Sequence, residues 1–176
     1  GTVATITQMM ATEGEINSLV RGQARIRLEE IVAHEPYLIG KVVEIPEDRD
    51  NSSEVLAYSS QLTDLFKKAI NMGKQAEVMT VMRLISGDMS PVEVVDQIAA
   101  ILDIKAEEKQ KILELFSLKP RMQKVLEHLA NEINALDLER TISTKTQKRF
   151  EETMRKNILR EKKRTIEKEL GEGEDE

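Results

Sequence analysis

The sequence contains no cysteine and no tryptophan, and it has only three phenylalanines and two tyrosines among 176 residues. The absence of cysteine excludes disulfides, thiolate metal sites and a cysteine nucleophile, and it suits a reducing compartment. The aromatic share of 3% predicts a core of Ile, Leu, Val and Met and argues against aromatic-lined pockets.

Long apolar runs are also missing. No stretch approaches the roughly 20 apolar residues that span a bilayer, and no basic and apolar leader opens the chain. We therefore expect a protein without a membrane partner, in the cytoplasm or alternatively in an organelle matrix.

Signatures of catalysis and of cofactor binding are absent as well. The sequence has no G-x-x-x-x-G-K-[ST], G-x-G-x-x-G or G-x-S-x-G motif, so we expect no catalytic residue and no bound nucleotide in this chain. His34 and His128 lack converging partners and are interpreted as surface or packing residues, not metal ligands. The run "DRDNSSE" lacks the glycine and the bidentate glutamate of a calcium loop.

What is present describes a folded chain with a highly charged surface, 40% apolar and 33% charged, with a net charge of −6. Residues 1–46 alternate with the period of strands, as in "TVATITQMM", "ARIRLEEIV" and "YLIGKVVEI", with Gly22 at a bulge or bend. This pattern predicts three or four antiparallel strands. So small a sheet must pack against something.

Beyond a polar hinge at residues 47–52, the apolar period changes to that of helices, which predicts a helical bundle over residues 53–138. The first helix starts at Ser52 or Ser53 and buries Leu56 among its apolar residues. A short second helix covers residues 76–85, and the third opens on a capping box at Ser90-Pro91-Val92-Glu93. A fourth spans residues 106–116. The predicted fold class is α+β, a small antiparallel β subdomain followed by an α-helical bundle that ends in one long extended helix.

The fifth helix is long because neither glycine nor proline occurs between Pro120 and Gly171. Its apolar stripe ends at Leu138, so residues 139–170 are predicted to project as a continuation of the helix, followed by an acidic linker at 171–176. Residues 139–168 carry eleven basic and five acidic side chains. This surplus could bind nucleic acid weakly, but the charges surround the helix without aromatic platforms, which favours a solvated or intersubunit helix.

Methionines cluster in two places. Four lie on the second helix and its flanks and two at the end of the first strand: Met72, Met79, Met82, Met89, Met9 and Met10. Filling of an aliphatic core is the favoured interpretation. The alternative is an adaptable surface that binds varied apolar segments.

Six segments in order resemble the amino-terminal region of Lon, the ATP-dependent serine protease family. They include "GTVATITQM", "EGEINSLVRGQARIRL", "VVDQIAAILDIKAEEKQKILEL", "RMQKVLEHLANEINALDLERTI" and "KNILREKKRTIEKELGE". The family's opening "P-L-x-P-L-R-x-x-V-x-F-P" segment is not present, and neither are its Walker motifs or Ser-Lys dyad. The chain thus resembles an internal fragment, in which residues 1–46 are part of a pseudouridine-synthase-like β domain.

The resemblance implies a substrate-recognition and assembly region of a protease that degrades misfolded, damaged and regulatory proteins. It implies unfolded protein substrates as partners, hexameric self-association of the parent, and ATP with Mg²⁺ in a module outside this chain. The six methionines named above are the candidate substrate-binding residues. Two alternatives remain: a nucleic-acid adaptor that uses Arg25, Arg27 and the basic helix, and a coiled-coil oligomerisation module.

Overall fold

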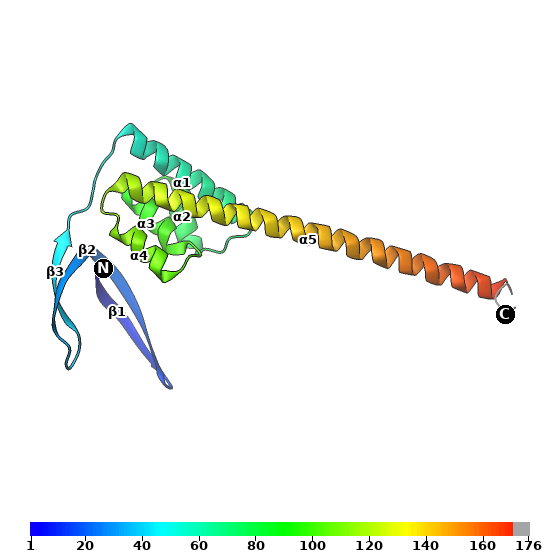
Figure 1. The fold of residues 1–176 in the computed structure, drawn as a ribbon, viewed down its shortest axis with the longest axis horizontal. Helices are drawn as coiled ribbons and strands as arrows, with labels where there is room; N and C mark the ends of the chain where they lie inside the picture. Colours follow the sequence, from blue (N-terminus) through cyan, green and yellow to red (C-terminus); the bar gives the residue numbers. More distant parts are fainter. Residues whose placement is uncertain (171–176) are drawn as a thin grey trace. The chain divides into compact units, whose positions relative to one another are not determined.

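The structure, a computed structural model, describes residues 1–170, and the predicted acidic linker at 171–176 lies outside them. The chain divides into two compact units, Gly1–Glu132 and Ile133–Glu176. The first unit holds a three-stranded antiparallel sheet, four short helices and the start of a long fifth helix (Figure 1). The predicted α+β class, with a small sheet, a bundle and one long last helix, is confirmed.

The sheet has the order β1-β2-β3, with strands at Thr2–Thr12, Glu15–Ala33 and Ile39–Ile45. Glu13 and Gly14 alone connect β1 to β2, and Gly14 supplies the positive φ of 89° that the turn requires. Val3 pairs with Ala24 while Ala4 pairs with Gly22, so one extra residue bulges at Gln23. The sequence predicts a bulge or bend at Gly22; the bulge lies one residue further, at Gln23, and β2 continues through it as a single strand.

The helices are α1 (Ser53–Asn71), α2 (Val78–Ser86), α3 (Pro91–Ile101), α4 (Ala106–Glu114) and α5 (Leu118–Glu169). Local chemistry fixes most of these ends. The Ser52 hydroxyl accepts from the Val55 backbone N–H at the start of α1, and Gly87, with φ 80°, ends α2. The capping box predicted for α3 is present in full, with Pro91 at its first position.

The core is formed by one face of each helix in the first unit. Its largest fully buried side chains are Phe66, Leu62, Leu84, Ile98, Leu102, Leu118, Met122 and Leu129. The prediction that Leu56 is buried is wrong, because this side chain is 53% exposed. Adjacent helix positions point about 100° apart, so Val55 takes the inner position and Leu56 the outer one.

The segment predicted as a hinge, residues 47–52, is held to the helices. The Asp48 carboxylate accepts from the Leu118 backbone N–H at 2.8 Å and so caps the start of α5. Asp50 accepts from the Ser52 N–H at 2.8 Å, and Lys119 lies 3.9 Å from the Asp50 carboxylate. Every residue of the sheet, by contrast, is exposed or half-buried.

Candidate polypeptide-binding surface

Helix α2 presents an apolar surface to solvent. Its exposed members, which we name the α2 surface, are Val78, Met79, Met82 and Ile85, with exposed fractions of 70%, 62%, 63% and 47%. Val78, Met82 and Ile85 recur at intervals of four and three residues and therefore share one side of the helix. Leu84 faces the core instead, at 1% exposure. A nine-residue helix thus anchors on Leu84 and leaves most of its apolar side chains in water.

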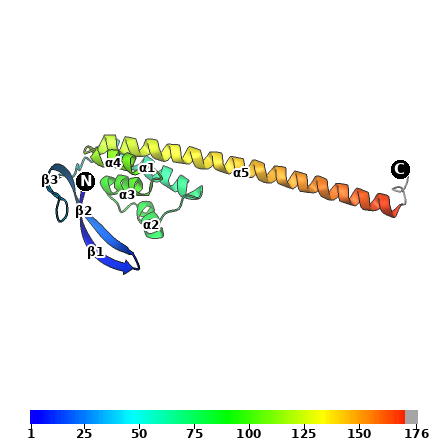
Figure 2. The ribbon, with the colours of Figure 1, turned by 60° about the horizontal axis from the view of Figure 1, so that its bottom comes forward.

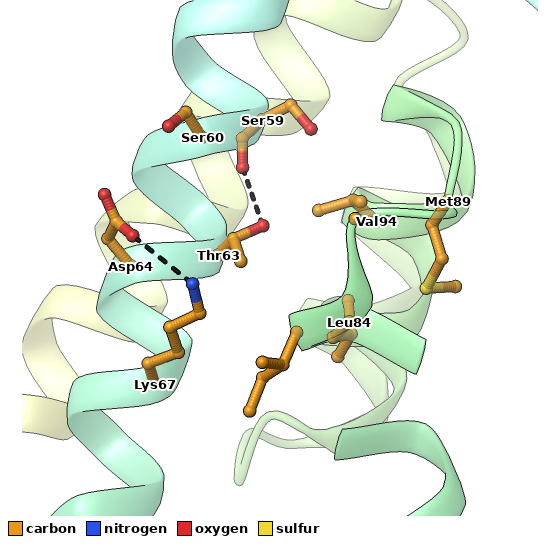
Figure 3. A pocket seen from close by; sticks show the side chains of 10 residues that line it. Ser59, Ser60, Thr63, Asp64, Lys67, Leu84, Met89 and Val94 are labelled. Atoms are coloured by element: carbon orange, nitrogen blue, oxygen red, sulfur yellow. Dashed lines mark hydrogen bonds and ion pairs between the residues drawn. The ribbon is translucent and has the colours of Figure 1, made fainter. Parts of the chain in front are cut away.

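A groove borders the α2 surface on the side of α1. It encloses about 260 Å³, and Figure 3 shows that one wall comes from α1 and the other from α2 and the start of α3. The α1 wall is polar: Thr63 donates its hydroxyl to the Ser59 carbonyl at 3.0 Å, and Lys67 lies 3.9 Å from Asp64. The facing wall is apolar and is lined by Leu84, Ile85, Met89 and Val94. This groove suits an extended chain with one apolar edge and one polar edge.

A second hollow lies at the other end of α2, where α1 ends. It encloses about 480 Å³ and is lined by Ile70, Lys74, Gln75, Ala76, Val78, Val81 and Met82. Val78 and Met82 belong to both this hollow and the α2 surface, while Ile85 belongs to the surface and the groove. The α2 surface therefore connects two depressions. Together they provide apolar area for more than one side chain of a bound segment.

The β1–β2 hairpin carries a second apolar surface. Residues that pair across the strands share a face, and alternation along β2 puts Ile16 and Val20 on the same side. Their partners Ala11 and Ile6, together with Met9 opposite Ser18, complete what we name the hairpin face. Ile6, Met9, Ile16 and Val20 are 55–69% exposed. Met10 and Leu19 lie on the opposite side of the hairpin and are exposed as well.

The six candidate methionines thus differ in their surroundings. Met9, Met10, Met79 and Met82 are exposed, so the interpretation that they fill the core is wrong. Met72, at the end of α1, and Met89, before α3, are half-buried. The structure brings Met79, Met82 and Met89 to α2 and its groove, and it places Met9 and Met10 on the hairpin.

Sequence reasoning missed several members of these surfaces. Val78 and Ile85 were detectable, because they recur with Met82 at helical spacing while the inner position of the same helix is already taken by Leu84. The polar groove wall at Ser59 and Thr63 was not detectable, because serine and threonine on a helix commonly face water. The hairpin residues Ile6, Ile16 and Val20 look like ordinary strand residues until the pairing shows that nothing in residues 1–170 buries them.

Nothing in the described part of the chain supports metal chemistry, since no group of three His, Cys, Asp or Glu side chains lies close enough to hold an ion. His34 is exposed, and the His128 side chain is 15% exposed with Nε2 lying 3.8 Å from a Glu108 carboxylate oxygen. Both fit the predicted surface and packing roles. No helix within residues 1–170 is long and apolar enough to cross a membrane.

Arg25, proposed above as a nucleic-acid contact, is occupied by the protein itself. Its guanidinium donates to the Leu113 and Leu115 carbonyls at 3.1 and 3.3 Å, and it lies 3.3 Å from both oxygens of the Asp96 carboxylate. The side chain is only 15% exposed. In this conformation, both terminal nitrogens of Arg25 are engaged by acceptors of the chain itself.

The fold is that of an α+β domain with two exposed apolar surfaces. Comparison with known families matches residues 1–131 to the ATP-dependent protease La (LON) substrate-binding domain. The chain belongs to this family of Lon substrate-binding domains.

Relatives agree with this assignment, and a solved structure shares the fold. The chain is 32% identical to Lon protease 2 of Desulfotalea psychrophila over 99% of its length, and 34% identical to the Lon protease of Syntrophomonas wolfei over 98%. It spans only 23% and 21% of those two proteins. The fold is similar to that of the N-terminal domain of a Mycobacterium avium complex Lon protease, with a TM-score of 0.61, 19% identity, and coverage of 74% of this chain and 69% of that one.

Proposed function

We propose that this chain recognises polypeptide substrates for a Lon-type ATP-dependent protease. Exposed apolar segments of misfolded, damaged or regulatory proteins would bind to the α2 surface and to the hairpin face. The observation that carries the proposal is the exposure of Met79 and Met82, at 62% and 63%, beside two hollows on a domain of this family.

Methionine suits this role for a physical reason. Its unbranched thioether side chain adapts its rotamers to partners of different shape, so one surface can accept varied apolar segments with modest affinity. The polar wall at Ser59 and Thr63 adds hydroxyl groups next to the apolar wall of the groove. A segment of mixed character would find a complementary partner there without a requirement for one sequence.

Proteolysis itself is assigned to the rest of the parent protein. We propose that ATP and Mg²⁺ bind to a module outside this chain, that the parent assembles as a hexamer, and that its peptidase cleaves what this domain delivers. The chain alone should neither hydrolyse ATP nor cut an unfolded protein.

A binding measurement tests the role of the α2 surface. We expect the chain to bind a labelled, unfolded casein-like protein in fluorescence anisotropy, and the double variant Met79→Gln, Met82→Gln to bind at least about tenfold more weakly. Loss of two partly buried Met contacts of about 1 kcal/mol each exceeds the roughly 1.4 kcal/mol that a tenfold change requires.

Met154→Gln is the matched control, since Met154 is also exposed, at 46%, but belongs to α5 in the second compact unit and is not a member of the α2 surface. This variant should bind as the unchanged protein does. Equal affinity of the double variant and the unchanged chain, or an absence of binding by both, would contradict the proposal.

A further inference from the structure

One guanidinium provides the polar connection between the sheet and the helices. Among residues 1–170, every side-chain hydrogen bond or ion pair that joins residues 1–45 to α1–α5 or to their connections starts at Arg25 on β2. One nitrogen, Nη1, donates to the Leu113 and Leu115 carbonyls. The other, Nη2, lies 3.3 Å from each oxygen of Asp96 on α3. A planar fork of donors is the group best suited to such a divided set of acceptors.

The acceptors for Arg25 are held in place by a second arginine. Arg121 on α5 is 3% exposed, and its Nη1 lies 3.2 Å from Asp96 Oδ1. Its Nε and Nη2 donate to the Leu115 and Phe116 carbonyls, both at 2.9 Å. Asp96 and the Leu115 carbonyl are therefore shared by the two arginines. Arg121 fixes the acceptors from within the bundle, and Arg25 meets them from the sheet.

Little else holds the sheet to the bundle. The sheet contributes no fully buried side chain to the core, its half-buried apolar residues are Ala24, Ile26, Ala33 and Ile45, and the chain itself joins it to the helices through residues 46–52. That segment is tied to the helices at Asp48, so the sheet is held at one covalent point and one ionic point. Figure 2 shows the strands beside the helical part of the first unit, not inserted into it.

We propose that Arg25, Asp96 and Arg121 form a latch, and that release of Arg25 lets the sheet move as a body relative to the helices while both parts stay folded. The asymmetry of the cluster gives the reason. When Arg25 leaves, Asp96 keeps Arg121 as its counter-charge, and the Arg25 guanidinium regains water. No buried charge is left without a partner, so the open state carries no large penalty inside the bundle.

The opposite end of the latch behaves differently. Removal of the Asp96 charge would leave the buried Arg121 guanidinium with two carbonyls and, within residues 1–170, no carboxylate in direct contact. A change at Asp96 should therefore destabilise the bundle as well as release the sheet. This difference separates a latch from a contact that merely contributes to overall stability.

Distance measurement between the two parts tests the proposal. The chain has no cysteine, so Lys41→Cys on β3 and Ser60→Cys on α1 introduce the only two labelling sites for paired nitroxides. We expect a single distance distribution in the otherwise unchanged chain and a clearly broader one after Arg25→Gln, with the thermal midpoint of helix unfolding unchanged. Asp96→Asn should broaden the distribution and also lower that midpoint.

Arg27→Gln is the matched control, because Arg27 lies two residues along the same strand, is exposed, and its side chain forms no hydrogen bond or ion pair within residues 1–170. Its distribution should stay narrow. Arg25→Lys keeps the charge but loses the fork, and it should give an intermediate width even if Arg25→Gln folds poorly. The proposal is overturned if Arg25→Gln and Arg25→Lys both remain as narrow as the control, or if the control is already as broad as Arg25→Gln.

Discussion

At the scale of single residues, the start of α3 shows how a few polar atoms fix a helix beside the candidate site. The Ser90 hydroxyl accepts from the Glu93 backbone N–H at 3.3 Å, and the Glu93 carboxylate accepts from the Ser90 N–H at 2.9 Å. This N–H, with the Ser90 hydroxyl and more distantly Arg83 of α2, holds the pKa of Glu93 below its ordinary value of 4.5. The capping box thus couples the stability of α3 to pH.

The sign of this coupling follows from the depressed pKa. The stabilisation by ionised Glu93 is fully present above about pH 4.5 and is lost as the pH falls through the lower pKa of the folded state. Glu93→Gln should therefore lower the free energy of unfolding at pH 7, by less than about 1 kcal/mol because the side chain is half exposed.

Urea unfolding of the unchanged chain and of Glu93→Gln at pH 7 and at pH 3 measures the effect. The difference in free energy of unfolding between the two chains should be smaller at pH 3. Glu77→Gln, at the N-cap of the neighbouring helix α2 where no side-chain cap bond forms, is the control for loss of a carboxylate without loss of a capping box. A difference that stays constant between the two pH values would contradict the coupling.

The identity of a residue as methionine does not determine whether its side chain is buried or exposed. Met122 is fully buried on α5, whereas Met79 and Met82 are exposed on α2. Methionine is compatible with both environments, so only the phase of each helix against the core decides between them. On α2 the inner position belongs to Leu84, and a rotation of the helix by about half a turn would have reversed the assignment.

At the scale of elements, chain-local signals predicted the helix ends well. Ser52, Gly87 and the Ser90 box act within four residues of the backbone groups that they satisfy, so the sequence is sufficient to locate them. The start of α5 was not predictable in the same way. Its cap, Asp48, lies 70 residues earlier in the chain, and no local sequence pattern predicts a hydrogen-bond partner at that separation.

The Asp48 cap leads to a prediction of its own. Asp48→Ala should remove the acceptor for the Leu118 N–H and lower the free energy of unfolding by about 1 kcal/mol, as is typical for loss of a helix cap. Asp48→Asn keeps an acceptor oxygen and should lower the free energy of unfolding by less. Thermal unfolding followed at 222 nm measures both.

Arg49→Ala is the control for Asp48, because Arg49 is 85% exposed and forms only a 3.9 Å ion pair with Glu47. It should be neutral. If Asp48→Ala is as neutral as Arg49→Ala, the cap does not stabilise the fold.

At the scale of the whole molecule, burial ends early along α5. The last buried side chain is Ile133, at 4% exposure, and between Leu138 and Leu170 every side chain is exposed except the half-buried Glu167. The dissolving apolar stripe predicted this change from residues alone. What residues 139–170 bind in the parent protein could not be predicted, because exposed charges fit water, nucleic acid and protein partners alike.

A chain shortened to end at Leu138 should therefore unfold at the same temperature as the full chain. A fall of more than about 5 °C, equivalent to roughly 1 kcal/mol, would show that the later part of α5 stabilises the core. Sedimentation of the two chains addresses the coiled-coil alternative separately, since that alternative requires self-association to vanish with residues 139–176.

The latch also has a consequence for synthesis of the chain. Arg25 is synthesised 71 residues before Asp96, whose carboxylate it contacts, and 90 residues before Leu115, whose backbone carbonyl accepts from it. At translation rates of about 5–20 residues per second, the sheet waits roughly 5–20 seconds for its anchor. During that interval the nascent chain displays an unanchored apolar hairpin, the same kind of surface that the finished domain is proposed to recognise in others.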